Sequence, residues 1–344
     1  MTALIPIFFA ALMITIAGTP VVRRVALRLG FVDAPAKRKL HQEPMPLMGG
    51  VAIFIGAIAA FLILFTFFDI TNRVIGIWLA LLIVAVIGLV DDRRGMSARV
   101  KLGGLGLAVL VLLYFDVSVS LRVPMWLNYL ITVVWILGIS NATNFLDNMD
   151  GLAAGTSGVS AAFVTVLAVY NDQYLVSALG AAVFGACLGF LRYNFKPAKI
   201  FMGDAGSLFL GFVLAILGLL LRFPDNTNVV TWLVPIFVLG LPIYDTTLVI
   251  VSRSRRGVNP FTTAGKDHTS HRLTQLGFTQ REAVLILYLT SGMFGMVALF
   301  VAQATVQDAI IITAVMASLG LYTIWWLERW RDQHPSPPSA TPPR

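Results

Sequence analysis

Long runs of apolar residues, separated by short polar connections, recur along the whole chain. A helix needs about 20 predominantly apolar residues to cross the hydrocarbon core of a bilayer. The runs occupy residues 2–28, 48–68, 74–90, 101–115, 124–140, 152–170, 174–191, 206–222, 230–251, 283–303 and 308–328. This pattern predicts an all-α, polytopic integral membrane protein with eleven transmembrane helices, or ten if one run does not cross. We expect a single membrane-embedded domain over residues 1–330.

The composition supports the same class of protein. Of the 344 residues, 58% are hydrophobic and only 12% are charged, too few charges to cover the surface of a soluble protein of this length. The first run has no basic stretch before it and no small-residue cleavage site, so we expect it to stay as the first helix. Residues 331–344 are rich in proline, and we expect a disordered tail there.

Basic residues are distributed unequally between the two sides of the predicted membrane. The connections after the first, third, fifth, seventh and ninth runs, with the tail, hold 22 of the 25 Lys and Arg residues, whereas the other side holds Arg73, Arg122 and Arg222. Lys and Arg are enriched on the cytoplasmic side, so these connections are predicted to be cytoplasmic, in a cell membrane. The net charge of +8 suits anionic lipid head groups or phosphorylated substrates there, and no nucleic-acid partner is expected.

Acidic side chains gather in the same predicted cytoplasmic connections. Asp91 and Asp92 stand where the third run ends, although carboxylates oppose the dipole at a helix C-terminus. This costly placement favours a functional role over a solvated helix end that pairs with its own arginines. Because adjacent residues on a helix point about 100° apart, the two carboxylates are not expected to do the same job.

The connection after the fifth run carries a polar pattern without any basic residue. Asn141, Asn144, Asp147 and Asp150 recur at every third position, which would form a polar stripe at helical spacing. Uncompensated carboxylates at the edge of a membrane protein indicate a cation or a substrate with many hydroxyl groups. A merely solvated loop is the alternative.

A glycine-rich string, GDAGS, begins at Gly203 and leads directly into the eighth run. Glycines allow a ligand to approach the backbone, and a helix N-terminus offers free N–H groups to phosphate. The carboxylate of Asp204 would repel that phosphate unless a divalent cation lay between them, and Mg²⁺ has the appropriate ligand preference. Capping of the helix by Asp204 is the alternative.

Histidines and basic residues occupy two further cytoplasmic connections. His268 and His271 stand three residues apart, and we interpret them as donors to phosphate or sugar oxygens, with a zinc pair as a weaker alternative. Asp245 lies inside the ninth run and is a functional candidate because buried acids are costly in membranes. The first connection contains a basic run and His41, which act either as an anchor or as part of the site. Its basic residues are Lys37, Arg38 and Lys39.

Six strings, taken in order, resemble the polyprenyl-phosphate N-acetylhexosamine-1-phosphate transferase family. They are RKLHQEPMPLMGG, the Asp91–Asp92 pair, NATNFLDNMDGLAAG, NFKPAKIFMGDAGSLFLG, PIYDTT and DHTSHRL, and they span about residues 20–280. The resemblance implies a membrane enzyme that transfers a sugar 1-phosphate, GlcNAc-1-phosphate in the branch we favour, from a UDP-sugar to a polyprenyl phosphate. The products would be polyprenyl-diphosphate-sugar and UMP, at the start of cell-wall or surface glycan assembly, with Mg²⁺ (or Mn²⁺ in its place) as cofactor.

The resemblance also implies roles for individual residues. Asp91 and Asp92 would be the catalytic pair that engages the lipid phosphate, and Asp204 would be catalytic and bind the metal together with Asp147. We expect the substrate contacts to be Lys101, Asn144, Asp147, Asp150, Asn194, Phe201, His268, His271 and Arg272. Two positions depart from the family pattern: Asn148 stands where glycine is usual, and Ser270 replaces the first of two adjacent histidines.

Other functions remain open at this point. A UDP-MurNAc-pentapeptide phosphotransferase of peptidoglycan synthesis is one, although the triple-histidine run of that branch is absent here. A transporter or flippase of lipid-linked sugars is another, but transporters place polar groups near the bilayer midplane on broken helices, and Asp245 is the main candidate for such depth. A homodimer is also left open.

Overall fold

The computed structural model describes residues 4–33, 44–62, 70–224, 226–261, 263 and 265–334. The predicted basic run at 37–39, His41 and most of the predicted disordered tail, residues 335–344, lie outside the described residues.

The described chain is helical apart from one short pair of strands. Strands β1 (Val32–Asp33) and β2 (Met45–Pro46) pair antiparallel, with Val32 opposite Pro46. The helices are α1 (Leu4–Leu29), α2 (Gly49–Leu62), α3 (Asn72–Arg94), α4 (Ala98–Tyr114), α5 (Met125–Leu146), α6 (Leu152–Tyr170), α7 (Tyr174–Asn194), α8 (Gly203–Leu220), α9 (Asn228–Val238), α10 (Gly240–Arg255), α11 (Thr269–Gln275), α12 (Gln280–Val301) and α13 (Val306–Gln333).

The predicted class, an all-α polytopic membrane protein, is confirmed. Eight described helices are long and apolar enough to cross a membrane: α1, α3, α5, α6, α7, α8, α12 and α13. The bent pair α9–α10 adds a ninth candidate. The remaining two apolar runs correspond to α2, with 14 described residues, and α4, with 17. Each of the eleven predicted runs therefore contains a helix or the bent pair.

The ninth run is broken by a bend of 75° between α9 and α10. Pro242 in the first turn of α10 has no N–H group, so the carbonyl of Val238 cannot receive the usual helical hydrogen bond from it. The hydroxyl of Ser160 donates to this carbonyl at 2.9 Å. A buried side chain thus satisfies the acceptor that the bend leaves open, as a low-dielectric environment requires.

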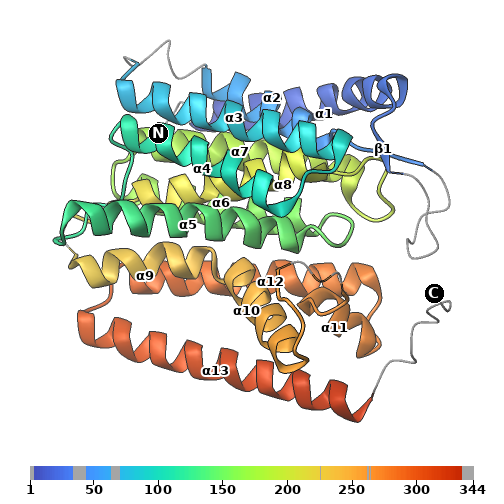
Figure 1. Ribbon diagram of the computed structural model, residues 1–344. Helices are drawn as coiled ribbons and strands as arrows, with labels where there is room; N and C mark the ends of the chain where they lie inside the picture. The colour runs from blue at the N-terminus through green and yellow to red at the C-terminus, as the bar shows by residue number, and fades with distance from the viewer. Residues whose placement is uncertain are drawn as a thin grey trace.

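Helix α8 forms the centre of the helix array. Fifteen of its 18 residues are buried, because α2, α3, α5 and α6 pack around it. Gly50 on α2 and Gly88 on α3 lie directly against the first turn of α8, where a Cβ on either residue would fall within 2.5 Å of α8 backbone atoms. In contrast, α13 runs along the outer edge of the array (Figure 1), and only 11% of its apolar window is buried.

Several helix boundaries differ from the predicted ones. Helix α5 continues to Leu146 rather than ending at residue 140, because Ala142, Thr143 and Leu146 on its inner face are buried against neighbouring helices. Helix α8 begins at Gly203, so Asp204 lies within its first turn, after the cap position, and the capping alternative for Asp204 was wrong. Helix α13 reaches Gln333, which makes the start of the predicted disordered tail helical.

Candidate active site

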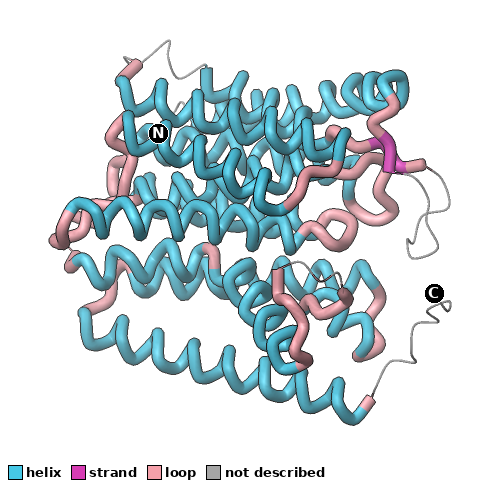
Figure 2. The backbone as a smooth tube through the Cα atoms, viewed as in Figure 1, coloured by secondary structure: helices cyan, strands magenta, loops and turns pink. Residues whose placement is uncertain are grey.

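The polar connections meet at one end of the helix array. The turn after α5, strand β1 and helix α11 all lie toward this end (Figures 1 and 2). A pocket of about 410 Å³ opens there. Its lining includes seven of the residues predicted from the sequence: Asp92, Asn144, Asp147, Asp150, Asn194, Phe201 and Asp204.

Asp92, at the end of α3, accepts hydrogen bonds from the start of α8. Its two carboxylate oxygens accept from the backbone N–H groups of Asp204 at 2.7 Å and Ala205 at 3.2 Å. These donors have no partner within their own helix, and the positive end of the α8 dipole favours a negative charge. The arrangement offsets the unfavourable position of Asp92 at the C-terminus of α3. Gly203 is required between them, because its φ is +73° and a Cβ there would lie 2.5 Å from the Asp92 carboxylate.

Asp91 has different partners from its neighbour. It is buried, accepts a hydrogen bond from the backbone N–H of Met96 at 2.5 Å, and forms an ion pair with Lys101. The same Lys101 ammonium bonds Asp204 at 3.0 Å. The two adjacent carboxylates thus have different partners, since Asp91 supports the α3–α4 turn and Lys101 while Asp92 supports α8. That they have different tasks in the reaction stays a prediction.

Asp204 stands between a cation and an amide. In addition to Lys101, its carboxylate accepts from the Asn144 side chain at 2.5 Å, and the same amide nitrogen lies 2.8 Å from the Ser207 hydroxyl. Asn144 is on the last turn of α5, so the unexpected extension of that helix is what brings its amide to Asp204. The side chain of Asp204 remains 31% exposed, which leaves it accessible to a ligand.

Asp147 and Asp150 complete the acidic wall of the pocket. Loss of surrounding water, together with the negative charges of Asp204, Asp92 and Asp150, raises the pKa of Asp147 to about 7. Asp150 accepts from the backbone N–H of Ala198 at 3.1 Å and lies 3.6 Å from the Lys196 ammonium. Such mutual repulsion among carboxylates indicates a site that is built for a positive ion.

Asn194 holds two connections together. Its side-chain oxygen accepts from the Gly151 N–H at 3.0 Å, and its amide donates to the Ile200 carbonyl at 2.9 Å. The residue is buried. The structure therefore gives Asn194 a scaffolding role in the pocket wall, and its predicted contact with substrate stays a prediction.

The histidines lie beside the pocket at the start of α11. Nδ1 of His268 is 2.8 Å from the buried carboxylate of Asp245, whose other oxygen accepts from the Thr269 N–H at 2.7 Å. A carboxylate at Nδ1 fixes the ring orientation and directs Nε2 away from it. Burial, with the nearby charges of His268 and Lys266, lowers the pKa of His271 to about 4, so His271 is neutral at pH 7. Asp245 thus serves the histidine motif.

Arg272 is not brought into the pocket. Its side chain is 1% exposed and points to the C-terminal helix, where its guanidinium bonds Glu328 at 2.7 Å and Ser252 at 3.0 Å. Glu328 also pairs with Arg255 at 3.1 Å and Arg331 at 2.9 Å. The sequence motif placed Arg272 next to His271, but neighbours on a helix point to different sides.

One acidic residue of the pocket was not predicted from the sequence. Asp33, on strand β1, lines the pocket with the other acids. It opens the first connection, four residues before the basic run begins at Lys37, and that position is the signal by which it could have been found.

The donor set fits a magnesium ion that is completed by its substrate. The pocket offers carboxylate and amide oxygens, which Mg²⁺ prefers, and Mg²⁺ usually takes one or two carboxylates plus phosphate oxygens and water. Among the described residues, no three His, Cys, Asp or Glu side chains are placed to hold a metal by themselves.

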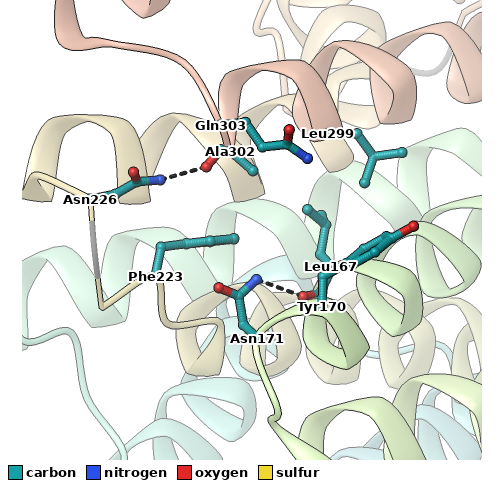
Figure 3. Close-up of a pocket in the computed structure, with 8 residues that line it drawn as sticks. All are labelled: Leu167, Tyr170, Asn171, Phe223, Asn226, Leu299, Ala302 and Gln303. Carbon is teal, nitrogen blue, oxygen red and sulfur yellow. Dashed lines mark hydrogen bonds between the residues drawn. The ribbon is translucent and has the colours of Figure 1, made fainter.

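A second pocket, of about 330 Å³, is lined by residues at the C-terminal ends of α6 and α12 (Figure 3). Its polar groups are mainly amides, and two of them donate to backbone carbonyls: Asn171 to Leu167 and Asn226 to Ala302. No acidic or basic side chain lines it. It lacks the charges that phosphate chemistry requires.

Comparison with known proteins gives consistent matches. Residues 74–222 match the family described as glycosyl transferase family 4. The chain is 38% identical to a probable undecaprenyl-phosphate N-acetylglucosaminyl 1-phosphate transferase of Bacillus subtilis, over 92% of this chain and 90% of the relative. It is 34% identical to a decaprenyl-phosphate N-acetylglucosaminephosphotransferase of Mycolicibacterium smegmatis, over 82% and 78%. It is 28% identical to an undecaprenyl-phosphate alpha-N-acetylglucosaminyl 1-phosphate transferase of Yersinia pestis, over 90% and 88%.

Proposed function

The chain belongs to the family of polyprenyl-phosphate N-acetylglucosamine-1-phosphate transferases, and from this premise we propose the reaction, the cofactor and the side of the membrane. It transfers GlcNAc-1-phosphate to a polyprenyl phosphate. We propose UDP-GlcNAc as donor, UMP as second product, Mg²⁺ as cofactor and a cytoplasmic site. The observation that carries the proposal is the gathering of Asp92, Asp147, Asp150 and Asp204 in one pocket.

The proposed reaction exchanges one phosphoanhydride bond for another. An oxygen of the lipid phosphate attacks the β-phosphorus of UDP-GlcNAc and forms the new P–O bond. The bond from that phosphorus to the bridging oxygen breaks, and its electron pair leaves with UMP. A phosphate monoester has a second pKa of about 6, so the attacking phosphate is already largely ionised at pH 7. We therefore assign Asp91 and Asp92 to positioning rather than to removal of a proton.

The residues of the pocket have distinct proposed tasks. Mg²⁺ held by Asp204 and Asp147 would neutralise the diphosphate and the developing charge on the leaving group. Lys101, which already bonds Asp204, adds a positive charge beside the phosphates. Asp92 fixes the start of α8 through two backbone N–H groups, and thereby fixes the direction of Asp204. Catalysis then rests mainly on position and charge, as is usual for phosphoryl transfer.

The reverse reaction tests the proposed function. The bond types on the two sides match, so the equilibrium constant should lie within one or two orders of magnitude of one. This corresponds to a driving force of no more than about 1–3 kcal/mol. Purified protein given polyprenyl-diphosphate-GlcNAc, Mg²⁺ and labelled UMP should therefore form labelled UDP-GlcNAc. Asp204→Asn is the control and should form almost none. If the protein were a transporter, neither the parent nor the Asp204→Asn variant would form UDP-GlcNAc. That outcome would contradict the proposed transferase function.

The side of the membrane requires a separate test. Single cysteines near Gly203 or His268, in a Cys187→Ser background, should react with membrane-impermeant reagents from the cytoplasmic side only. The 22 of 25 basic residues on that side support this expectation. Labelling from outside intact cells would contradict it.

A further inference from the structure

A partly buried hydrogen bond joins the acidic turn, residues 147–150 after α5, to the histidine helix, α11. The hydroxyl of Ser270 on α11 donates to the side-chain oxygen of Asn148 at 2.5 Å, across 122 positions of sequence. Ser270 is completely buried. The amide nitrogen of Asn148 donates to the Phe145 carbonyl at 2.9 Å, and this second bond directs the Asn148 oxygen toward Ser270.

The two partners are the two positions at which the sequence departs from the family pattern. Glycine would remove the acceptor at 148, and histidine would replace a small hydroxyl at 270 with a ring. Compared with the family pattern, the chain thus has a larger side chain at position 148 and a smaller one at position 270. In a close-packed interior, such changes are tolerated best when they conserve volume together, whereas an isolated increase overfills the contact.

The bond lies where it can control the position of the histidines. Helix α11 has only seven residues, and Asp245 holds its start from the side of α10. Asn148 holds the same end from the side of the acidic turn, next to Asp147. The Phe145 ring also meets the His268 ring edge to face, with centroids 6.4 Å apart. Asn148 itself lines the acidic pocket, so the contact connects the pocket wall directly to the histidine helix.

We infer that Asn148 and Ser270 are a matched pair of positioning residues that sets the distance between the acidic pocket and the histidine helix, and thereby the fit of the UDP-sugar between them. The inference rests on the proposed function. The resemblance assigns the lipid phosphate to Asp91 and Asp92 on α3, whereas the pair lies between the turn after α5 and α11. The pair should therefore govern binding of the nucleotide sugar and leave the lipid substrate largely unaffected.

A double-mutant cycle tests the pair. Asn148→Gly leaves a buried hydroxyl without its acceptor and Ser270→His overfills the contact, and each should raise the KM for UDP-GlcNAc by about tenfold or more. The double variant, Asn148→Gly with Ser270→His, should return to within about threefold of the parent, because non-additivity is expected for residues in contact. The KM for polyprenyl phosphate should change little throughout.

Two further measurements separate positioning from general stability. Ser160→Ala removes another buried serine bond between helices, at a residue that does not line the pocket, and should leave the KM for UDP-GlcNAc unchanged. The rise in unfolding temperature on addition of UDP-GlcNAc with Mg²⁺ follows binding without turnover, and should show the same loss and recovery across the cycle.

Each outcome decides one question. Additive effects in the cycle, single variants equal to the parent, or equal changes in the KM of both substrates would overturn the inference. If the parent binds UDP-GlcNAc in the thermal assay but forms no product, the proposed reaction fails, and the cycle in the thermal assay still decides the role of the pair.

Discussion

Replacing Gly88 by alanine should lower turnover sharply while leaving the membrane fold in place. Gly88 on α3 faces the first turn of α8, in which Asp204 lies. A Cβ at this position would be 2.3 Å from the Cα and 2.6 Å from the nitrogen of Ala205, and 2.7 Å from the carbonyl oxygen of Asp204. All three are backbone atoms, which cannot rotate away as a side chain could.

The size of the effect follows from these distances. Ordinary contact begins at 3.4 Å, so α3 and α8 must separate by roughly 1 Å, since close-packed interiors leave no slack. The bonds from Asp92 to the N–H groups of Asp204 and Ala205, now 2.7 and 3.2 Å, would then exceed hydrogen-bond length. Overpacking costs about 1–3 kcal/mol, which a domain of ordinary stability survives. A displacement of 1 Å at a catalytic group, however, can reduce turnover about 100-fold.

The matched control is the same substitution at Gly138 on α5. A Cβ there would have no atom within 4 Å. Both variants would be purified in detergent and compared for unfolding temperature, and for turnover at saturating concentrations of both substrates. Gly138→Ala should behave like the parent. If folded Gly88→Ala also kept turnover within about threefold of the parent, the contact between α3 and α8 would not determine the geometry of the pocket.

Three further predictions concern titratable residues. Asp91→Asn and Asp92→Asn should both reduce transfer, but Asp92→Asn should lower the unfolding temperature more, because its new amide N–H₂ faces two backbone donors; equal losses would contradict the different roles of the pair. His271→Gln should lose less thermal stability than the parent between pH 7 and 5. The pKa of His271 in the folded state lies below its usual value. Its contribution to stability is therefore complete above the pKa that it has in the unfolded state, and is lost as the pH falls toward about 4. Parallel pH profiles of unfolding temperature for the variant and the parent would refute this. Glu328→Gln should destabilise the protein by about 3–5 kcal/mol, because it leaves the buried guanidinium of Arg272 without its counter-charge; an unchanged unfolding midpoint would show that the ion pairs do not hold α13.

The sequence predicted the helices well because hydropathy reports directly on burial in lipid. It also identified most of the pocket, since uncompensated acids at helix ends are costly and therefore conspicuous. Asp92, Asp147 and Asp204 come from three different connections, yet the structure places them in one cavity. Carboxylates at positions where their surroundings make a negative charge costly were thus the most informative signal.

Contacts between distant segments could not be predicted in the same way. Nothing near Arg272 in sequence indicates that Glu328, 56 positions later, is its partner. Hydropathy placed the end of α5 at residue 140, whereas tertiary burial of Leu146 carries the helix six residues further. The bond between Asn148 and Ser270 likewise depends on how α11 folds back. Hydropathy cannot distinguish a residue that faces lipid from one that faces another helix.

The central place of α8 has a consequence for how the protein is made. The helices that mainly enclose it, α2, α3, α5 and α6, all precede it in the chain, so they leave the ribosome before α8 does. In a nascent chain that has reached only α7, Gly50 and Gly88 would lack the α8 backbone against which they lie in the complete fold. Arrival of α8 supplies this backbone and delivers Asp204 to its partners in the same event. The acidic pocket is therefore completed when α8 packs, before the helix that carries His271 has been made.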